Sequence, residues 1–204
     1  MPTNQERRAE TPAAAPRRRG RKRSEETRLA ILTAALALLS EVGYAGLTIE
    51  GIAARAGCGK QTIYRWWPTK GDVLLDALAL KAETHVTIAD HGSYAADLRA
   101  FLADSFRLGR LPQVTEVLRA MVAQALADPE FAGRFRETFL ATRREALSTV
   151  VLRARERGDL PPRPAPGTVL DLVFGVLWYR VLITGGPLDE DLVGELLAAL
   201  TSGD

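Results

Sequence analysis

The chain has 204 residues, of which 47% are hydrophobic and 25% are charged, as in an average soluble globular protein. This composition excludes collagen-like, mucin-like and wholly disordered chains. One cysteine permits no internal disulfide bond, and with only two histidines it argues against a structural zinc site. The first 25 residues are charged and lack an apolar core, so we predict no signal peptide and a cytoplasmic location.

Positive charge is concentrated at the start of the chain. Residues 1–23 hold eight Arg and Lys side chains against Glu6 and Glu10, so the overall net charge of +2 leaves the remainder acidic. Only this front end is therefore expected to face a polyanion. Because residues 1–23 are rich in Pro, Ala and Arg and show no apolar periodicity, we predict that they form a disordered basic arm.

Apolar residues at helical spacing follow this arm through the rest of the chain. A first helix is predicted to begin at Ser24 as its N-cap and to stop at Gly43. Short helices from Thr48 and from about residue 59 come next, and Thr69 is expected to cap a fourth. Further helices are predicted at 93–109, 113–127, 130–157, 167–184 and 189–201. No alternating run predicts a strand, so the expected fold is all-α.

The stretch 169–183 is the most apolar part of the C-terminal region. It contains Asp171 and Arg180 and is shorter than a bilayer requires, so we predict no membrane contact.

The pattern that points to function lies between Thr48 and Lys70. Two short helices are separated by a turn at Gly57, which can take the positive φ that a sharp interhelical turn needs. Ala53 is small enough to let the helices approach closely. This spacing predicts a helix-turn-helix. Its second helix is expected to present donors suited to phosphates and major-groove base edges, namely Lys60, Gln61, Thr62, Tyr64 and Arg65.

This segment resembles the DNA-binding domain of the tetracycline-repressor family of bacterial regulators. The matching segments are Gly43-Tyr44, Leu47-Thr48-Ile49, Ile52-Ala53, Ala56-Gly57-Cys58, Thr62-Ile63-Tyr64, Trp66-Trp67 and Pro68-Thr69-Lys70. The resemblance covers about residues 24–80. Cys58 departs from the pattern, since a β-branched apolar residue is commoner there, and we interpret it as a small core side chain.

The resemblance implies a sequence-specific transcriptional regulator with two helical domains. Residues 24–70 would form a three-helix, helix-turn-helix DNA-binding domain, and residues 71–204 a larger C-terminal ligand-binding and dimerisation domain. The function implied is repression of a palindromic double-stranded DNA operator, relieved by a small-molecule effector. Thr48, Trp66 and Lys70 join the predicted DNA contacts. Arg19, Arg21 and Arg23 of the arm are added, and either minor-groove binding or non-specific attraction remains open for them.

Two further sets of residues are predicted in the larger domain. Aromatic and Met side chains with few polar groups favour an apolar or amphipathic effector. The candidate pocket residues are Phe101, Phe106, Met121, Gln124, Phe135 and Phe139, although each of these could simply pack the core. The helix at 167–184 is apolar nearly all round and, with the next helix, is expected to form a homodimer as in the family. The candidate interface residues are Val173, Phe174, Leu177, Val181, Leu192 and Leu196.

Two other classes of function would require different sequence features. A non-specific architectural DNA-binding protein would use the Arg-rich arm and lose little on changing Gln61 or Tyr64. A helical enzyme would need a nucleophile with a base, or paired carboxylates. The chain has no G-x-S-x-G, H-E-x-x-H or P-loop sequence, so we predict no enzymatic activity, no cofactor and no metal.

Overall fold

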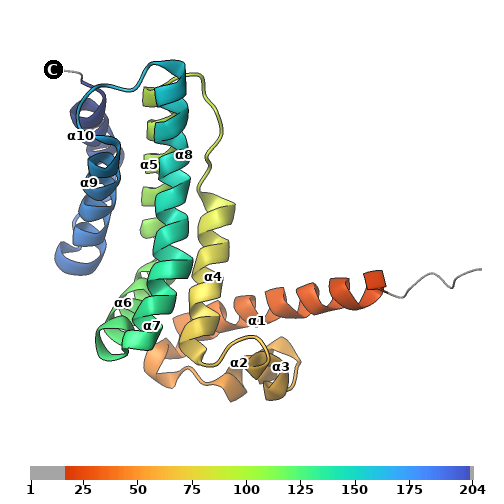
Figure 1. The fold of residues 1–204 in the computed structure, drawn as a ribbon. Helices are drawn as coiled ribbons and strands as arrows, with labels where there is room; N and C mark the ends of the chain where they lie inside the picture. Colours follow the sequence, from red (N-terminus) through yellow and green to blue (C-terminus); the bar gives the residue numbers. More distant parts are fainter. Residues whose placement is uncertain (1–16, 203–204) are drawn as a thin grey trace, which may run out of the picture.

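The computed structural model describes residues 17–202, with side chains from Ser24 onward, and this part of the chain is helical without any strand. The all-α prediction is therefore confirmed. In Figure 1, α1 (Arg17–Gly46) crosses the lower end of a bundle of long helices that contains α4, α5 and α8. The short helices α2 (Ile49–Ala56) and α3 (Lys60–Tyr64) lie beneath it, while α9 and α10 pack on the far side of the bundle.

The small N-terminal unit is shaped by its caps and glycines. Gly43 has φ of 66° and breaks α1 where the sequence predicts its end, but helical residues continue to Gly46. The Thr48 hydroxyl accepts a hydrogen bond from the Gly51 N–H and caps α2. Gly57 ends α2 in the left-handed region, with φ of 67°. Ile52 and Ile63 are fully buried between α1, α2 and α3.

The start of α1 differs from the prediction. The helix begins at Arg17, seven residues before the expected N-cap Ser24, so residues 17–23 are helical and not part of a disordered arm. Arg and Lys are good helix formers, and an existing helix extends at little cost because only its first turn needs nucleation. The predicted disorder of residues 1–16 lies outside the described residues.

Helix α4 (Lys70–His85) connects the two parts of the molecule. It begins with a capping box, in which the Thr69 hydroxyl accepts from the Asp72 N–H and the Asp72 carboxylate accepts from the Thr69 N–H. Its residues Leu74 and Leu78 are almost wholly buried. Because α4 contacts α1 at one end and α5 and α6 along its length, it belongs to both units.

The larger unit is built from helices close to those predicted. They are α5 (Tyr94–Gly109), α6 (Pro112–Ala127), α7 (Pro129–Arg134), α8 (Ala141–Arg157), α9 (Pro166–Trp178) and α10 (Glu190–Thr201). Two π-helical segments extend this set, η1 (Phe135–Leu140) between α7 and α8 and η2 (Tyr179–Thr184) after α9. Its core contains fully buried aromatic residues such as Tyr94, Phe101 and Phe131.

Two helical segments, Ser24–Gly46 and Pro166–Thr184, are long and apolar enough to cross a membrane by length and composition alone. The apolar stretch 169–183 is shorter than this, but the helix that contains it extends beyond it at both ends and reaches 19 residues. Both segments also supply buried core residues, such as Leu39 and Val173, and core helices of soluble proteins pass the same test.

Candidate DNA-binding surface and effector cavity

Helix α3 presents the predicted DNA-contacting side chains at the surface. Lys60, Gln61, Tyr64 and Arg65 are exposed and Thr62 is half-buried, while Ile63 between them is fully buried and holds the helix on the core. Gly59 precedes α3 as an N-cap without a side chain, so the backbone N–H groups at this end are not blocked. An exposed polar face on a short helix fixed by one apolar anchor is what a groove-reading element requires.

The two tryptophans after α3 have different surroundings, as their adjacent positions predict. Trp67 is 4% exposed, and its indole N–H donates to Asp76 Oδ2 at 2.9 Å. Trp66 is half-buried and packs edge-on against Trp67, with the Arg65 guanidinium 5.0 Å from its ring centroid. The exposed side of Trp66 and the Arg65 charge therefore share one patch of surface.

Lys70 has a different role from the predicted phosphate contact. Its Nζ donates to the backbone carbonyls of Tyr44 and Leu47 at 2.8 and 2.9 Å and lies 4.5 Å from the centroid of the Tyr44 ring. These carbonyls follow the Gly43 break, where the helix leaves acceptors unpaired. The structure therefore places Lys70 as a tether between α4 and the end of α1.

Arg19, Arg21 and Arg23 belong to the helical start of α1, but their side chains lie outside the described residues. Their predicted DNA contacts stay predictions. Thr48 is exposed, with its hydroxyl already accepting the capping bond from Gly51.

A polar network fixes α4 to the DNA-binding unit. Asp76 Oδ2 accepts from Trp67 and also from Arg28 Nη2 of α1 at 3.0 Å. This pair raises the pKa of Arg28, mainly through the hydrogen bond to Asp76. One carboxylate on α4 therefore holds both α1 and the segment after the reading helix.

A second junction joins α1 and α4 to α6 and α7. The Tyr44 hydroxyl donates to Gln124 Oε1 at 2.5 Å, and Arg134 Nε donates to Asp72 Oδ1 at 2.8 Å. Gln124 also lies so close to Gly71 that a Cβ there would collide with its amide. The prediction that Gln124 lines the effector pocket is therefore wrong, because this side chain sits at the boundary between the two units.

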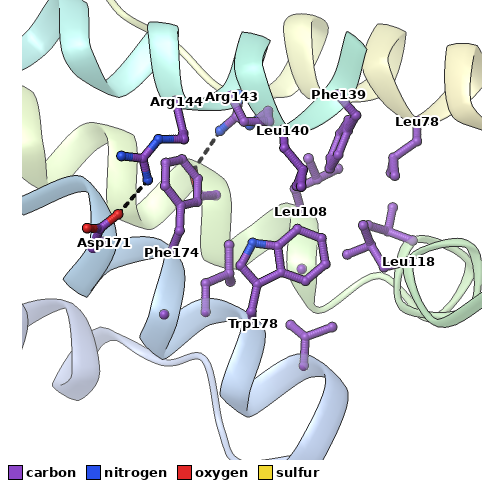
Figure 2. A pocket seen from close by; sticks show the side chains of 16 residues that line it. Leu78, Leu108, Leu118, Phe139, Leu140, Arg143, Arg144, Asp171, Phe174 and Trp178 are labelled. Atoms are coloured by element: carbon purple, nitrogen blue, oxygen red, sulfur yellow. Dashed lines mark hydrogen bonds and ion pairs between the residues drawn. The ribbon is translucent and has the colours of Figure 1, made fainter. Parts of the chain in front are cut away.

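The larger unit contains an apolar cavity of about 280 Å³. It lies between α4, α5, α6, η1, α8 and α9, and both π-helical segments contribute to its wall. Figure 2 shows Trp178 near its centre, Leu118 and Phe139 on one side, and Arg143, Arg144 and Asp171 on the other. The full lining is Leu78, Ser105, Leu108, Gly109, Val114, Leu118, Phe139, Leu140, Arg143, Arg144, Asp171, Phe174, Gly175, Leu177, Trp178 and Val181.

Of the predicted pocket residues, Phe139 alone lines this cavity. Phe101, Phe106 and Met121 are fully buried in the core, which is the alternative that the sequence left open. Phe135 is also buried, stacked on Phe139 and edge-on to Trp178. Phe101 and Phe135 therefore support the cavity wall from behind, since Phe101 packs edge-on against Phe174 and Phe135 contacts Phe139 and Trp178.

Arg143 and Trp178 are cavity residues that sequence reasoning missed. Arg143 is half-buried and donates to Ser105 Oγ at 3.2 Å, with its guanidinium 5.2 Å from the Phe101 ring centroid. Arginines are common in helices, so the sequence alone does not single out Arg143. Only its orientation into the cavity, which the structure shows, does so. Arg144, in contrast, is exposed and pairs with Asp171 of α9 at 2.7 Å.

The predicted dimer residues are mostly covered within one chain. Val173, Phe174, Val181, Leu192 and Leu196 are each 9% exposed or less. Phe174, Leu177 and Val181 contribute to the cavity wall. The interface assignment therefore needs correcting, since the apolar side chains that α9 and η2 leave exposed are others. These are Leu172, Tyr179 and Ile183, which are 45%, 58% and 73% exposed.

Comparison with known proteins identifies both units. Residues 31–77 match the bacterial regulatory proteins of the tetR family, and residues 88–200 match the tetracyclin repressor-like C-terminal domain. The chain is 31% identical to the HTH-type transcriptional regulator YdeS of Bacillus subtilis over 88% of this chain and 90% of that one. It is 34% identical to the HTH-type transcriptional repressor LfrR of Mycolicibacterium smegmatis over the same shares.

Solved structures agree with this assignment. The TetR family transcription regulator SCO0332 superposes with a TM-score of 0.77 and 31% identity, over 88% of this chain and 98% of that one. FadR from Bacillus subtilis, solved in complex with stearoyl-CoA, has the same fold with a TM-score of 0.67 and 20% identity, over 86% and 98%. The chain therefore belongs to the tetracycline-repressor family of bacterial DNA-binding transcriptional regulators, which are not enzymes.

Proposed function

We propose that this regulator is a repressor that binds a palindromic operator as a homodimer in the cytoplasm and is released by a small molecule in the cavity. The observation that carries the proposal is the course of α4. Its first residue, Lys70, is bonded to the end of α1, and Leu78, eight residues later, lines the cavity. Eight residues of helix span only about 12 Å, so a ligand that contacts Leu78 acts on the same short helix that is bonded to the DNA-binding unit containing α3.

The proposed coupling follows from where α4 is fixed. Asp76 binds Arg28 and Trp67 on the DNA side, and Asp72 binds Arg134 on the effector side. A displacement of α4 would therefore turn the DNA-binding unit relative to the bundle. An effector can shift DNA binding only by its difference in affinity for the two positions of α4.

An exposed apolar stripe supports the homodimer. Leu172, Tyr179 and Ile183 recur at helical spacing on α9 and η2, and the exposed Gly175 lies between them. Large side chains in one exposed row are typical of a protein interface. Pairing through a two-fold axis would place two α3 helices on successive turns of DNA. Because the two helices are related by that axis, the operator is expected to be palindromic.

In-vitro selection of bound DNA from a random pool tests this function. We expect an enriched inverted repeat with half-sites separated by about one helical turn or more. Compounds are then screened for release of that DNA in a fluorescence-anisotropy assay. A pool that shows no enrichment, with steep salt dependence, would instead favour the architectural DNA-binding protein.

A further inference from the structure

Arg143 brings a positive charge to the cavity without a carboxylate to balance it. Its only hydrogen bond among the described side chains is the one to Ser105, and none of the ion pairs there involves it. Three arginines of the same unit are paired with acids, and others, such as Arg110 and Arg119, donate to backbone carbonyls. Arg134 contacts Asp72, Arg144 contacts Asp171 and Arg157 contacts Asp97.

The surroundings of Arg143 make this charge costly. Burial lowers the pKa of Arg143 to about 10, because no neighbouring anion offsets the lost hydration. The guanidinium stays protonated at neutral pH. A charge held in this way attracts an anion strongly, because apolar surroundings screen the two charges less than water does and the guanidinium has already lost part of its hydration.

The cavity is divided into a polar and an apolar end. In Figure 2, Arg143, Arg144 and Asp171 lie on one side, and Leu78, Leu118 and Phe139 on the other. Its volume of about 280 Å³ is roughly twice that of the 150 Å³ cavity known to hold benzene, so it suits a body of about a dozen non-hydrogen atoms. The polar and apolar ends together with this volume fit a small amphipathic molecule.

The donor set favours a carboxylate over a phosphate. One guanidinium with one hydroxyl matches the two oxygens and single charge of a carboxylate. A phosphate monoester carries about two negative charges at neutral pH, and the second arginine here, Arg144, is already paired with Asp171.

We propose that the cavity binds a small amphipathic monocarboxylate, with its carboxylate on Arg143 and its apolar body against Leu118, Phe139 and Trp178. This inference rests on the proposed function only in calling that molecule the effector. The carboxylate would take the place of water at Arg143 and keep the hydroxyl of Ser105 as a second donor.

Isothermal titration calorimetry on the full chain tests the proposal with two probes of equal length, decanoate and neutral decanol. We expect decanoate to bind at least tenfold more tightly than decanol. Arg143→Gln should remove this preference, weakening decanoate by about tenfold to a hundredfold while leaving decanol unchanged. Unchanged decanol binding also shows that the variant is folded. Arg143→Lys should keep part of the preference, and the control Arg155→Gln, at an exposed position of α8 outside the cavity lining, should keep all of it.

Three results would overturn the proposal: no binding of decanoate, equal binding of the two probes, or loss of the preference in Arg155→Gln but not in Arg143→Gln. A gel-shift assay on the selected operator tests the carboxylate site separately from the proposed release of DNA by an effector. If decanoate binds through Arg143 but does not release DNA, the carboxylate site at Arg143 is supported and its role in effector-driven release is contradicted. If other compounds release the DNA but decanoate does not bind, effector-driven release is supported and the carboxylate site is contradicted.

Discussion

Lys60 and Lys70 show how differently two lysines of one DNA-binding unit can act. Lys70 donates two charge-assisted hydrogen bonds to backbone carbonyls inside the protein. Lys70→Met should therefore lower the free energy of unfolding by about 1–3 kcal/mol, because two acceptors lose a charged donor. Urea unfolding followed by circular dichroism measures this, and an unchanged midpoint would show that Lys70 does not tether α4.

Lys60 is exposed, and among the described side chains it meets only Glu50, at 3.6 Å, in an ion pair that contributes little in water. Lys60→Ala should leave stability unchanged, weaken binding to all DNA sequences alike, and reduce the salt slope of DNA affinity by about one unit. Affinities measured at several salt concentrations on operator and random DNA test this. A selective loss on the operator would mean that Lys60 reads bases.

Gln61 is the exposed side chain of α3 best suited to reading a base, since its amide can both donate and accept. Gln61→Ala should change which bases are preferred at one position of each half-site, at a cost of about 1–3 kcal/mol on the present operator. Repeating the DNA selection with this variant gives the answer directly. The same preferred sequence from both proteins would rule Gln61 out as a base contact.

At the scale of elements, the contact of α4 with α6 depends on the missing side chain of Gly71. A Cβ there would displace the Gln124 amide and break its hydrogen bond to Tyr44. Gly71→Ala should therefore destabilise the protein by about 1 kcal/mol, the net value of that hydrogen bond. Gln124→Ala removes the obstacle, so the double variant should be more stable than the two separate costs predict. Thermal unfolding of the wild type, the two single variants and the double variant measures the coupling energy. Strictly additive stability changes would contradict the contact between Gly71 and Gln124.

At the scale of the whole molecule, association is expected to use the exposed row on α9 and η2. Tyr179→Glu or Ile183→Glu should give a folded monomer, because a charge there opposes association but disturbs no core. Leu126→Glu, on α6 and 85% exposed, is the matched control and should remain a dimer. Light scattering at micromolar concentration separates these outcomes. A monomeric wild-type chain would refute the homodimer.

Phe174→Glu addresses a different property, because Phe174 is 8% exposed and packs edge-on against Phe101. Burying an unpaired carboxylate among apolar side chains should unfold the chain and not merely separate two copies. Circular dichroism distinguishes a lost fold from a lost interface. A helical, folded monomer would mean that Phe174 lies in the interface after all.

Local signals in the sequence were sufficient for the helices and their ends. Gly57 and Thr69 act within a few residues of themselves, so the end of α2 and the cap of α4 could be predicted and are confirmed. The start of α1 could not, since arginines favour helix and charge repulsion opposes it, and the sequence alone does not say which is stronger.

The sites were harder to predict because they depend on which face of a helix turns inward. The segment 169–183 is apolar nearly all round, so periodicity gives no direction, and Phe174, a predicted interface residue, points inward. Lys70 and Gln124 contact residues 23 to 80 positions away, a distance at which no local pattern gives information. The cavity arises only when five or more helices meet.

The ion pair between Arg144 and Asp171 joins α8 to α9 where the cavity reaches the surface. Both side chains are substantially exposed, so the pair is weak and opens often. It would act as a kinetic barrier more than a thermodynamic one, slowing the entry and exit of a ligand by similar factors. Added salt screens such a pair. Stopped-flow mixing of the protein with a neutral ligand such as decanol should therefore show both rate constants rising slightly with ionic strength, while their ratio, the affinity, stays the same.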